Sequence, residues 1–263
     1  MNIFQAIILG IVQGITEFLP ISSSGHLIVL QRVFGMEEPA FTFDIIVHFG
    51  TLIAIIVYFR ADIVAIIKNP FGRLTWLLVV GTIPAVIAGF FLRNIIETQF
   101  RTGIWLAAAF TLTGVLMVLA DRFTTGTKEE RDITWFDALF IGCCQALALP
   151  PGISRSGTTI TGGLTRGLNR ETAARYSFLL AMIAIAGASV LETVDVIRDG
   201  TRATNIGVAP LVAGFVVSAV VGYLCIKLLL KLIKACKLRY FSIYLWILAG
   251  LIFVDWLIFN RFF

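Results

Sequence analysis

Long runs of apolar residues dominate the pattern along the chain. The segments 74–92, 104–120 and 208–226 contain no charged residue, and each approaches the roughly 20 apolar residues that a helix needs to cross a bilayer. With three further apolar stretches, the pattern predicts six membrane-spanning helices, at 42–59, 74–92, 104–120, 174–191, 208–230 and 241–259. We therefore expect an all-α integral membrane protein.

Two other pairs of apolar segments are interrupted by Pro, Ser and Gly. Residues 3–19 and 26–34 are joined through the loop that ends at Gly25, and residues 134–149 and 158–168 are joined through 150–157. Each pair is too interrupted to cross a membrane and predicts a re-entrant helix-loop-helix hairpin. Non-helical backbone at membrane depth is tolerated only where protein or a water-filled cavity surrounds it, so both loops should lie inside the molecule.

The two hairpins belong to an internal repeat. At an offset of 132 positions, Gly10 matches Gly142, Gln13 matches Gln145, and the run 21–25 matches 153–157. Farther along, at an offset of 133, two more glycines keep their places, so that Gly81 matches Gly214 and Gly89 matches Gly222. We predict a single membrane domain, 1–263, built from repeat one (1–125) and repeat two (133–263). Three crossings per repeat invert the second half, and inverted repeats bring their broken helices together near the bilayer midplane, so the two loops should face each other.

Composition agrees with a membrane protein, since 58% of the residues are hydrophobic and 14% are charged, against about a quarter charged in an average soluble domain. The net charge of +5 is expected from Lys and Arg at helix ends and gives no support to nucleic-acid binding. The cysteines lack the spacing of a zinc site or a disulfide framework. We interpret them as small apolar filler; they are Cys143, Cys144, Cys225 and Cys236.

Basic residues are unevenly distributed over the expected loops, and cytoplasmic loops of membrane proteins are enriched in Lys and Arg. One side holds 14 of the 21 basic residues, Arg170 and Arg175 among them, and Arg155 lies inside the second loop. The opposite side, which includes both termini, holds six: Arg32, Arg93, Arg101, Arg198, Arg202 and Arg261. The count predicts that both termini are extracytoplasmic, that the first hairpin opens to the outside and that the second opens to the cytoplasm.

The loops combine hydroxyls, glycines and helix starts. Ser22, Ser23 and Ser24 precede a helix expected to begin near His26, and Ser is a preferred N-cap. Free backbone N–H groups and the positive end of the helix dipole attract phosphate at such a position. The second loop repeats this arrangement and adds Arg155, whose planar guanidinium suits bidentate phosphate contact. Two such loops meeting at one point would suit a diphosphate.

Glu17 and Gln13 lie just before the first loop, four residues apart and therefore on one helix face. An ionisable group inside a membrane segment indicates function, and Glu17 could hold Mg²⁺ or Ca²⁺, whose ligands are oxygen atoms. His26 could take a proton from a serine or from water, attack phosphorus itself, or only bond a backbone carbonyl. His48 and Asp44 form a weaker pair, for which packing and a substrate or proton role are equally open.

Two motifs are specific enough to indicate a family. The first runs from Gln13 to His26 and contains the amide/acid pair followed by the Ser-rich loop. The second reads Pro151-Gly152-Ile153-Ser154-Arg155-Ser156-Gly157-Thr158-Thr159. On these residues the chain resembles, over essentially its whole length, the undecaprenyl-diphosphate phosphatase family, also known as bacitracin-resistance proteins.

The resemblance implies hydrolysis of undecaprenyl diphosphate to undecaprenyl phosphate and inorganic phosphate, which recycles the lipid carrier of cell-wall synthesis and confers bacitracin resistance. It also implies a multi-pass protein of the bacterial inner (plasma) membrane with a divalent-cation requirement. By position, the implied catalytic residues are Glu17, Ser23, His26 and Arg155, and the implied metal-binding residues are Glu17 and Gln13. The implied substrate-binding residues are Ser22, Ser24, Gly25, Ser154, Ser156, Gly157, Thr158 and Thr159. Where some members have a second Glu, this chain has Gln13, which puts two-carboxylate metal binding in doubt.

In the expected mechanism, Arg155 and both helix N-termini hold the diphosphate, metal near Glu17 offsets negative charge, and Ser23 or water attacks with His26 as base. The resemblance leaves open whether Ser, His or water is the nucleophile. An inverted repeat with midplane loops is also transporter architecture, so a flippase of the polyprenyl phosphate carrier is the alternative. A carrier needs no Ser, His and Arg constellation, and the motifs therefore favour the enzyme. The lipid diphosphate and the membrane are the expected partners, and a homodimer is left open.

Overall fold

The computed structural model describes residues 1–36, 40–100, 102–123, 125–199, 206–235, 237–259 and 261–263. Six of its helices are long and apolar enough to cross a membrane. They are α3 (Phe41–Tyr58), α5 (Arg73–Gln99), α6 (Gly103–Ala120), α9 (Arg170–Asp199), α10 (Val208–Ala235) and α11 (Arg239–Val254). They coincide with the six expected spans, which confirms an all-α, multi-pass membrane protein. Arg101, Arg202 and Cys236 lie outside the described residues.

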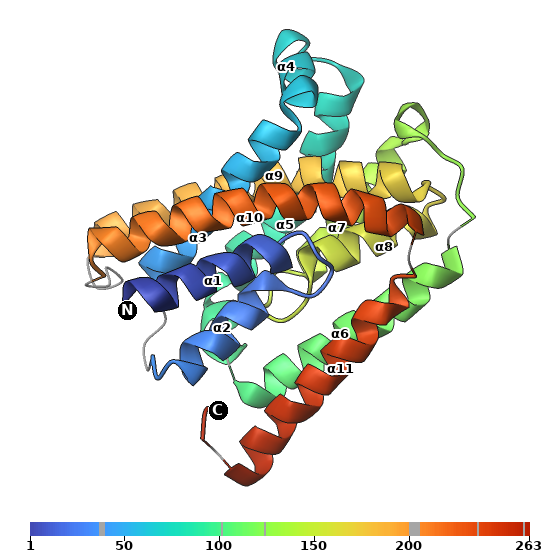
Figure 1. Cartoon of the computed structure of the whole chain (residues 1–263). Helices are drawn as coiled ribbons and strands as arrows, with labels where there is room; N and C mark the ends of the chain where they lie inside the picture. Colours follow the sequence, from blue (N-terminus) through green and yellow to red (C-terminus); the bar gives the residue numbers. More distant parts are fainter. Residues whose placement is uncertain (37–39, 101, 124, 200–205, 236, 260) are drawn as a thin grey trace.

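Helix limits differ from the expected ones mainly at the polar ends. α5, α9 and α10 end at Gln99, Asp199 and Ala235, beyond the apolar stretches, because a helix continues past its apolar part where the polar residues can be solvated. A short helix, α4 (Arg60–Lys68), occupies a segment expected to be a loop. None of its residues is buried, and it projects from the body of the protein (Figure 1).

Each interrupted pair forms a helix-loop-helix hairpin. The first consists of α1 (Ile3–Thr16) and α2 (Ser23–Val33), and the second of α7 (Trp135–Leu147) and α8 (Arg155–Thr165). With 14 residues, α1 is about 21 Å long, whereas the hydrocarbon core of a bilayer is about 30 Å thick. These lengths are compatible with re-entrant hairpins, and that placement in a membrane stays a prediction.

Glycine contacts join each hairpin to a long helix of the other half of the chain. α1 packs on α10 and α7 packs on α5. A Cβ on Gly10 of α1 would lie 2.9 Å from the carbonyl oxygen of Gly214 in α10, and a Cβ on Gly142 of α7 would overlap the carbonyl group of Gly81 in α5. The repeat offsets relate these two contacts to each other. Backbone-to-backbone packing therefore ties both hairpins into the helical body.

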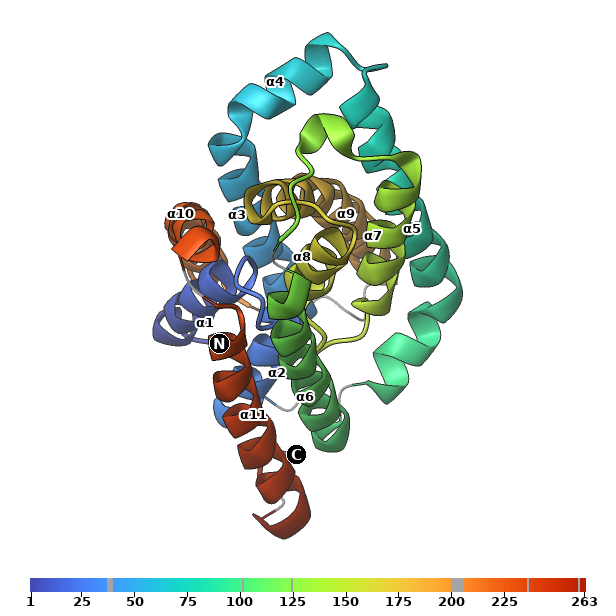
Figure 2. The ribbon, with the colours of Figure 1, turned by 90° about the vertical axis from the view of Figure 1, so that its right-hand side faces the viewer.

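α6 and α11 form a pair of their own, lying side by side along most of their length in both views (Figures 1 and 2). Gly114 of α6 makes room for the indole of Trp246 from α11, where a Cβ would collide with the ring. The indole Nε1 donates to the carbonyl of Thr111 at 3.2 Å. This pair brings the middle of α11 close to the hairpin loops.

A buried aromatic contact fixes the end of the first hairpin. Phe18 is fully buried, and its ring meets that of Phe178 from α9 edge-on, with centroids 5.7 Å apart. An edge-to-face contact of this kind adds to the free energy gained from burying both rings. Because Phe18 directly follows Glu17, its burial holds the Glu17 backbone in the protein interior.

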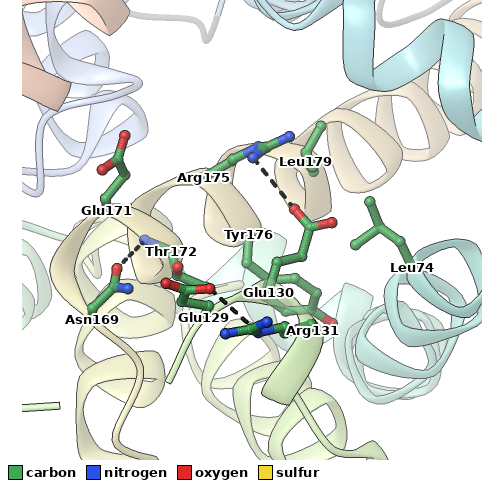
Figure 3. A pocket seen from close by; sticks show the side chains of 10 residues that line it. All are labelled: Leu74, Glu129, Glu130, Arg131, Asn169, Glu171, Thr172, Arg175, Tyr176 and Leu179. Carbon is green, nitrogen blue, oxygen red and sulfur yellow. Dashed lines mark hydrogen bonds and ion pairs between the residues drawn. The ribbon is translucent and has the colours of Figure 1, made fainter. Parts of the chain in front are cut away.

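The loops expected to be rich in basic residues meet at one end of the molecule. Arg175 is ion-paired with Asp62 and, at 3.6 Å, with Glu130, while Arg170 contacts Asp121 at 3.2 Å. Figure 3 shows the polar hollow of about 410 Å³ that Arg175 and Glu130 border. These contacts join loops that the topology assigns to one side of the membrane. Which side is cytoplasmic stays a prediction.

Candidate functional site

Serine side chains cap the second helix of each hairpin, α2 and α8. The hydroxyl of Ser22 accepts the N–H of Gly25 at 3.4 Å, and the hydroxyl of Ser154 accepts the N–H of Gly157 at 3.1 Å. Each helix therefore begins directly after its capping serine, three residues before the starts expected at 26 and 158. The earlier start moves the key residues of both loops from the loop into the first helical turn.

The two loops lie against each other, which confirms that they face one another. The hydroxyl of Ser156 in α8 donates to the carbonyl of Leu19 in the first loop at 3.0 Å. A Cβ on Gly25 would lie 3.0 Å from the Cα of Gly152, so the two backbones nearly touch. Gly152 has a φ of 91°, a conformation that glycine adopts without steric cost. Glycine at both positions permits this close approach.

Glu17 is the point at which the two halves of the chain meet. Its Oε2 accepts hydrogen bonds from Nε2 of Gln13 at 3.1 Å and from the hydroxyl of Ser23 at 2.5 Å. Its Oε1 accepts a hydrogen bond from Nη2 of Arg155 at 2.5 Å. Glu17 is only 7% exposed, and a buried carboxylate needs such partners to remain charged. A single carboxylate thus holds the serine of one loop and the arginine of the other.

The second guanidinium nitrogen of Arg155 is buried and free of hydrogen-bond partners within the described part of the chain. Nη2 is committed to Glu17, whereas Nη1 has no acceptor. Buried donors in proteins are almost always satisfied, and a charged donor without a partner is especially costly. Nη1 is therefore suited to an anion that enters the site, and a phosphate oxygen would supply the missing acceptor.

His26 contacts the backbone of the first loop and an aromatic side chain of α11. Its Nδ1 lies 2.6 Å from the carbonyl oxygen of Ser22 and its Nε2 lies 2.7 Å from the hydroxyl of Tyr244. Because a carbonyl only accepts, Nδ1 carries the proton, and in the neutral ring Nε2 accepts from Tyr244. Ser22 has a φ of 70°, a strained conformation for serine, which the bond from His26 helps to hold. The hydroxyl of Ser23 is bonded to Glu17 and not to His26.

His48 lies closer to the site than its weak sequence signal indicated. Its Nδ1 is 2.7 Å from the carbonyl oxygen of Asp44, and its Nε2 is 3.7 Å from Oε2 of Glu17. The Asp44 side chain accepts a hydrogen bond from Gln31 of α2 at 2.7 Å. The two side chains of the suspected pair thus point to different partners, and His48 belongs to the surroundings of Glu17.

The remaining predicted substrate-binding residues support the helix starts. The hydroxyls of Ser24 and Ser22 are 3.4 Å apart, and those of Ser156 and Ser154 are 3.2 Å apart. Thr158 and Thr159 both donate to the carbonyl of Arg155, at 2.9 and 2.8 Å, and Thr159 also contacts Ser177 of α9 at 2.6 Å. These contacts fix the position of Arg155. Direct contact of these residues with substrate stays a prediction.

Comparison with known proteins identifies the family. Residues 6–251 match the family model described as bacitracin resistance protein BacA, which is most of the chain. The chain belongs to the BacA family. It is 46% identical to an undecaprenyl-diphosphatase of Carboxydothermus hydrogenoformans, over 97% of each chain. It is also 43% identical to an undecaprenyl-diphosphatase 4 of Bacillus cereus, over 96% of each chain, and 42% identical to an undecaprenyl-diphosphatase of Methanosphaera stadtmanae, over 93% of this chain and 94% of the relative. The resemblance drawn from the two motifs is confirmed.

One residue beside the BacA-family motifs was missed in the sequence. Tyr244 lies in α11, within the apolar stretch 241–259, and its hydroxyl is bonded to His26. Tyr240, one turn earlier on the same helix, looks equivalent in the sequence, and the two tyrosines are both exposed, at 59% and 46%. No local signal separates the two tyrosines, because only the packing of α11 on α6 decides which of them reaches His26.

The oxygen atoms near Glu17 fit a divalent cation in part. Oε1 of Gln13 is buried and, among the described residues, has no hydrogen-bond partner. The amide of Gln13 turns its NH₂ group toward Glu17, since only that group can donate to a carboxylate. Among the described residues, no three or more His, Cys, Asp or Glu side chains lie close enough together to hold a metal ion by themselves. One carboxylate with one amide oxygen resembles a Mg²⁺ site that substrate phosphates complete.

Proposed function

We propose that this BacA-family protein hydrolyses undecaprenyl diphosphate to undecaprenyl phosphate and inorganic phosphate. The names of its relatives support this substrate, and the family membership supports a role in bacitracin resistance. The observation that carries the proposal is the arrangement at Glu17, where a carboxylate bonds a serine hydroxyl at 2.5 Å and an arginine whose buried Nη1 has no acceptor among the described residues. A base, a nucleophile and an anion-binding group are the parts that phosphoryl transfer requires.

In the proposed reaction, the terminal phosphoryl group binds between Ser23 and Arg155. The oxygen of Ser23 attacks the terminal phosphorus while its proton passes to Glu17. The bond between that phosphorus and the bridging oxygen breaks, and undecaprenyl phosphate leaves. Water then attacks the phosphorus of the phosphoserine, and the bond from phosphorus to the serine oxygen breaks as that oxygen takes back the proton from Glu17. Phosphate leaves with the protons of the water. Nη1 of Arg155 and the N-termini of α2 and α8 stabilise negative charge in both steps.

The base in this proposal is Glu17 rather than His26. Ser23 donates to Glu17, whereas both ring nitrogens of His26 already have partners. We assign His26 and Tyr244 to positioning of the first loop, through the carbonyl of Ser22. A divalent cation held by Glu17 and Gln13 would neutralise phosphate charge in the site.

Phosphate release by the purified protein in detergent tests the hydrolase activity. A detergent micelle does not separate two compartments, so movement of a carrier lipid across a membrane cannot contribute to the result. We expect turnover of undecaprenyl diphosphate, and a loss of at least about a hundredfold in Glu17→Gln, the lower end for a lost acid/base group. Ser23→Ala should also lose the activity. Its matched control is Ser242→Ala, since Ser242 is also a helical serine whose hydroxyl donates within the protein.

The nucleophile is tested separately. With Ser23 as nucleophile, rapidly quenched turnover yields a phosphorylated peptide that contains Ser23, and Ser23→Ala abolishes both the peptide and the activity. If Ser23→Ala retained activity and no phosphopeptide formed in the parent, water would be the nucleophile. If the parent released no phosphate under any cation, the hydrolase proposal would be lost and the flippase alternative would gain support.

We also propose that the protein lies in the plasma membrane with both termini outside the cytoplasm. The support is the excess of Lys and Arg in the loops that contact one another near Arg175. In a cysteine-free background, Asn2→Cys should react with a membrane-impermeant maleimide in intact cells. Thr125→Cys, in the opposite loop, should react only after permeabilisation. Labelling of Thr125→Cys in intact cells would reverse the orientation.

A further inference from the structure

An apolar groove runs between α3 and α9 outside the polar site. Its volume is about 740 Å³, within the roughly 300 to 1,000 Å³ typical of pockets that hold small molecules. Leu52 and Ile56 of α3 form one wall, and Met182, Ile183 and Ala186 of α9 contribute to the other. Every residue that lines the groove is apolar or glycine. The groove can therefore hold hydrocarbon but offers nothing to a phosphate.

Both walls of the groove start close to residues of the polar site. On α3, Leu52 follows His48 by four residues, about 6 Å along the helix, and His48 contacts Glu17. On α9, Met182 follows Ser177 by five residues, about 7.5 Å, and Ser177 is bonded to Thr159 of α8. The polar end of an amphiphile at Glu17 and Arg155 would thus place its chain within reach of the groove.

The groove is open to its surroundings at a glycine. A Cβ built on Gly187 of α9 would meet no atom within 4 Å, and neighbouring Val190 and Leu191 are 56% and 64% exposed. By contrast, Leu52 on the inner wall is only 7% exposed. The groove thus passes from the interior beside the site to the lipid-facing surface, as the path of a long membrane-embedded chain would require.

We infer that this groove binds the prenyl units of the substrate that lie nearest the diphosphate. The inference rests on the proposed hydrolase function and names the part of the protein that recognises the lipid. Binding of the first prenyl units would orient the diphosphate between the two loops, and the rest of the chain would continue into the bilayer. Recognition would be by shape and van der Waals packing, because a prenyl chain that leaves the hydrocarbon of the bilayer for an apolar groove is not removed from water.

Filling the groove tests the inference. Gly187→Leu places a side chain in the open space without a collision, and should raise the KM for undecaprenyl diphosphate about tenfold with kcat nearly unchanged, a loss of about 1.4 kcal/mol in binding. The inhibition constant of a diphosphate with a single prenyl unit should change less than twofold, because Gly187 lies ten residues beyond Ser177, about 15 Å by helical rise, and one prenyl unit is too short to reach it. Gly250→Leu is the matched control, because Gly250 is also an exposed helical glycine with no atom within 4 Å of its Cβ position. Equal KM values for the two variants would overturn the inference.

A measurement that needs no turnover separates this inference from the proposed activity. A prenyl diphosphate with a diazirine in its first prenyl units should cross-link, on irradiation of the purified protein, to peptides that contain 52–56 and 182–191. Excess unlabelled prenyl diphosphate should suppress the cross-links. Cross-links to other helices, or suppression by bulk phospholipid alone, would show that the groove only contacts membrane lipid. Absence of phosphate release together with specific cross-links would instead reject the hydrolase proposal and retain the groove.

Discussion

Replacement of Arg155 by lysine separates charge from geometry at the site. The guanidinium has one nitrogen on Glu17 and a second, buried nitrogen without an acceptor in the described residues. A lysine ammonium is a single point charge. It can remain close to Glu17, but it cannot also present a second donor in the plane of the first. Arg155→Lys should therefore keep the attraction for the diphosphate and lose the directed contact with the transferring phosphoryl group.

The expected magnitude follows from that one contact. A hydrogen bond to a charged group contributes about 1.5 to 3 kcal/mol, and each 1.36 kcal/mol corresponds to a factor of ten in rate. Since the contact matters more in the transition state than in the ground state, kcat should fall by roughly ten- to a hundredfold while KM changes by less than about threefold. Arg155→Ala would lose binding as well, and would leave Glu17 buried without its cation, which costs about 3 to 5 kcal/mol of stability.

The assay is phosphate release by purified protein at varied concentrations of undecaprenyl diphosphate. The matched control is Arg166→Lys, because Arg166 lies eleven residues further along, about 16 Å by helical rise, and is also ion-paired to a buried carboxylate, Asp137, at 2.7 Å. Both variants should elute as monodisperse protein. If Arg155→Lys turned over within twofold of the parent, Arg155 would act only as a general counter-charge, and the proposed attack between the facing loops would lose its main support.

Three further outcomes follow from contacts elsewhere in the structure. Tyr244→Phe removes the hydroxyl bonded to His26. It should lower kcat about fivefold, which corresponds to one lost hydrogen bond of about 1 kcal/mol, and should lower the melting temperature by no more than a few degrees; unchanged kcat would remove Tyr244 from the site. Gly142→Ala, which collides with α5, should lower the melting temperature by several degrees, whereas Gly187→Ala should not. Burial raises the pKa of Asp137, but hydrogen bonds from the Thr134 backbone, Arg166, Lys128 and the Thr134 hydroxyl outweigh it and lower the pKa from 3.8 to about 2. The charged carboxylate therefore stabilises the fold above pH 3.8. Asp137→Asn should lower the free energy of unfolding by about 2 kcal/mol at pH 7, and this difference from the parent should disappear as the pH falls through about 2.

Much of the architecture could be predicted because its signals are local in the chain. A helix that faces lipid must be apolar over its whole length, so the six spans are visible as uncharged runs. The Pro, Ser and Gly interruptions also mark the hairpins locally, because Pro breaks a helix, Ser caps the next one and Gly permits the turn between them. Glu17, Ser23, His26 and Arg155 also stand out in the sequence, because polar residues are rare in an apolar context and fall in two recognisable motifs.

The partners of these residues were decided only by the tertiary structure. Glu17 and Arg155 are 138 positions apart, and His26 and Tyr244 are 218 apart. Whether two such side chains meet depends on the angle at which their helices cross and on the rotation of each helix about its axis. Both depend on contacts elsewhere, such as the glycine contacts of α1 and α7 and the contact of Phe18 with Phe178. From the sequence, His26 is expected to act as the base for attack by Ser23 or water, whereas in the fold the hydroxyl of Ser23 donates to Glu17. The groove between α3 and α9 could not be predicted from the sequence either, because all its lining residues are apolar or glycine. Only the packing of the helices determines which apolar side chains cover one another and which leave a space.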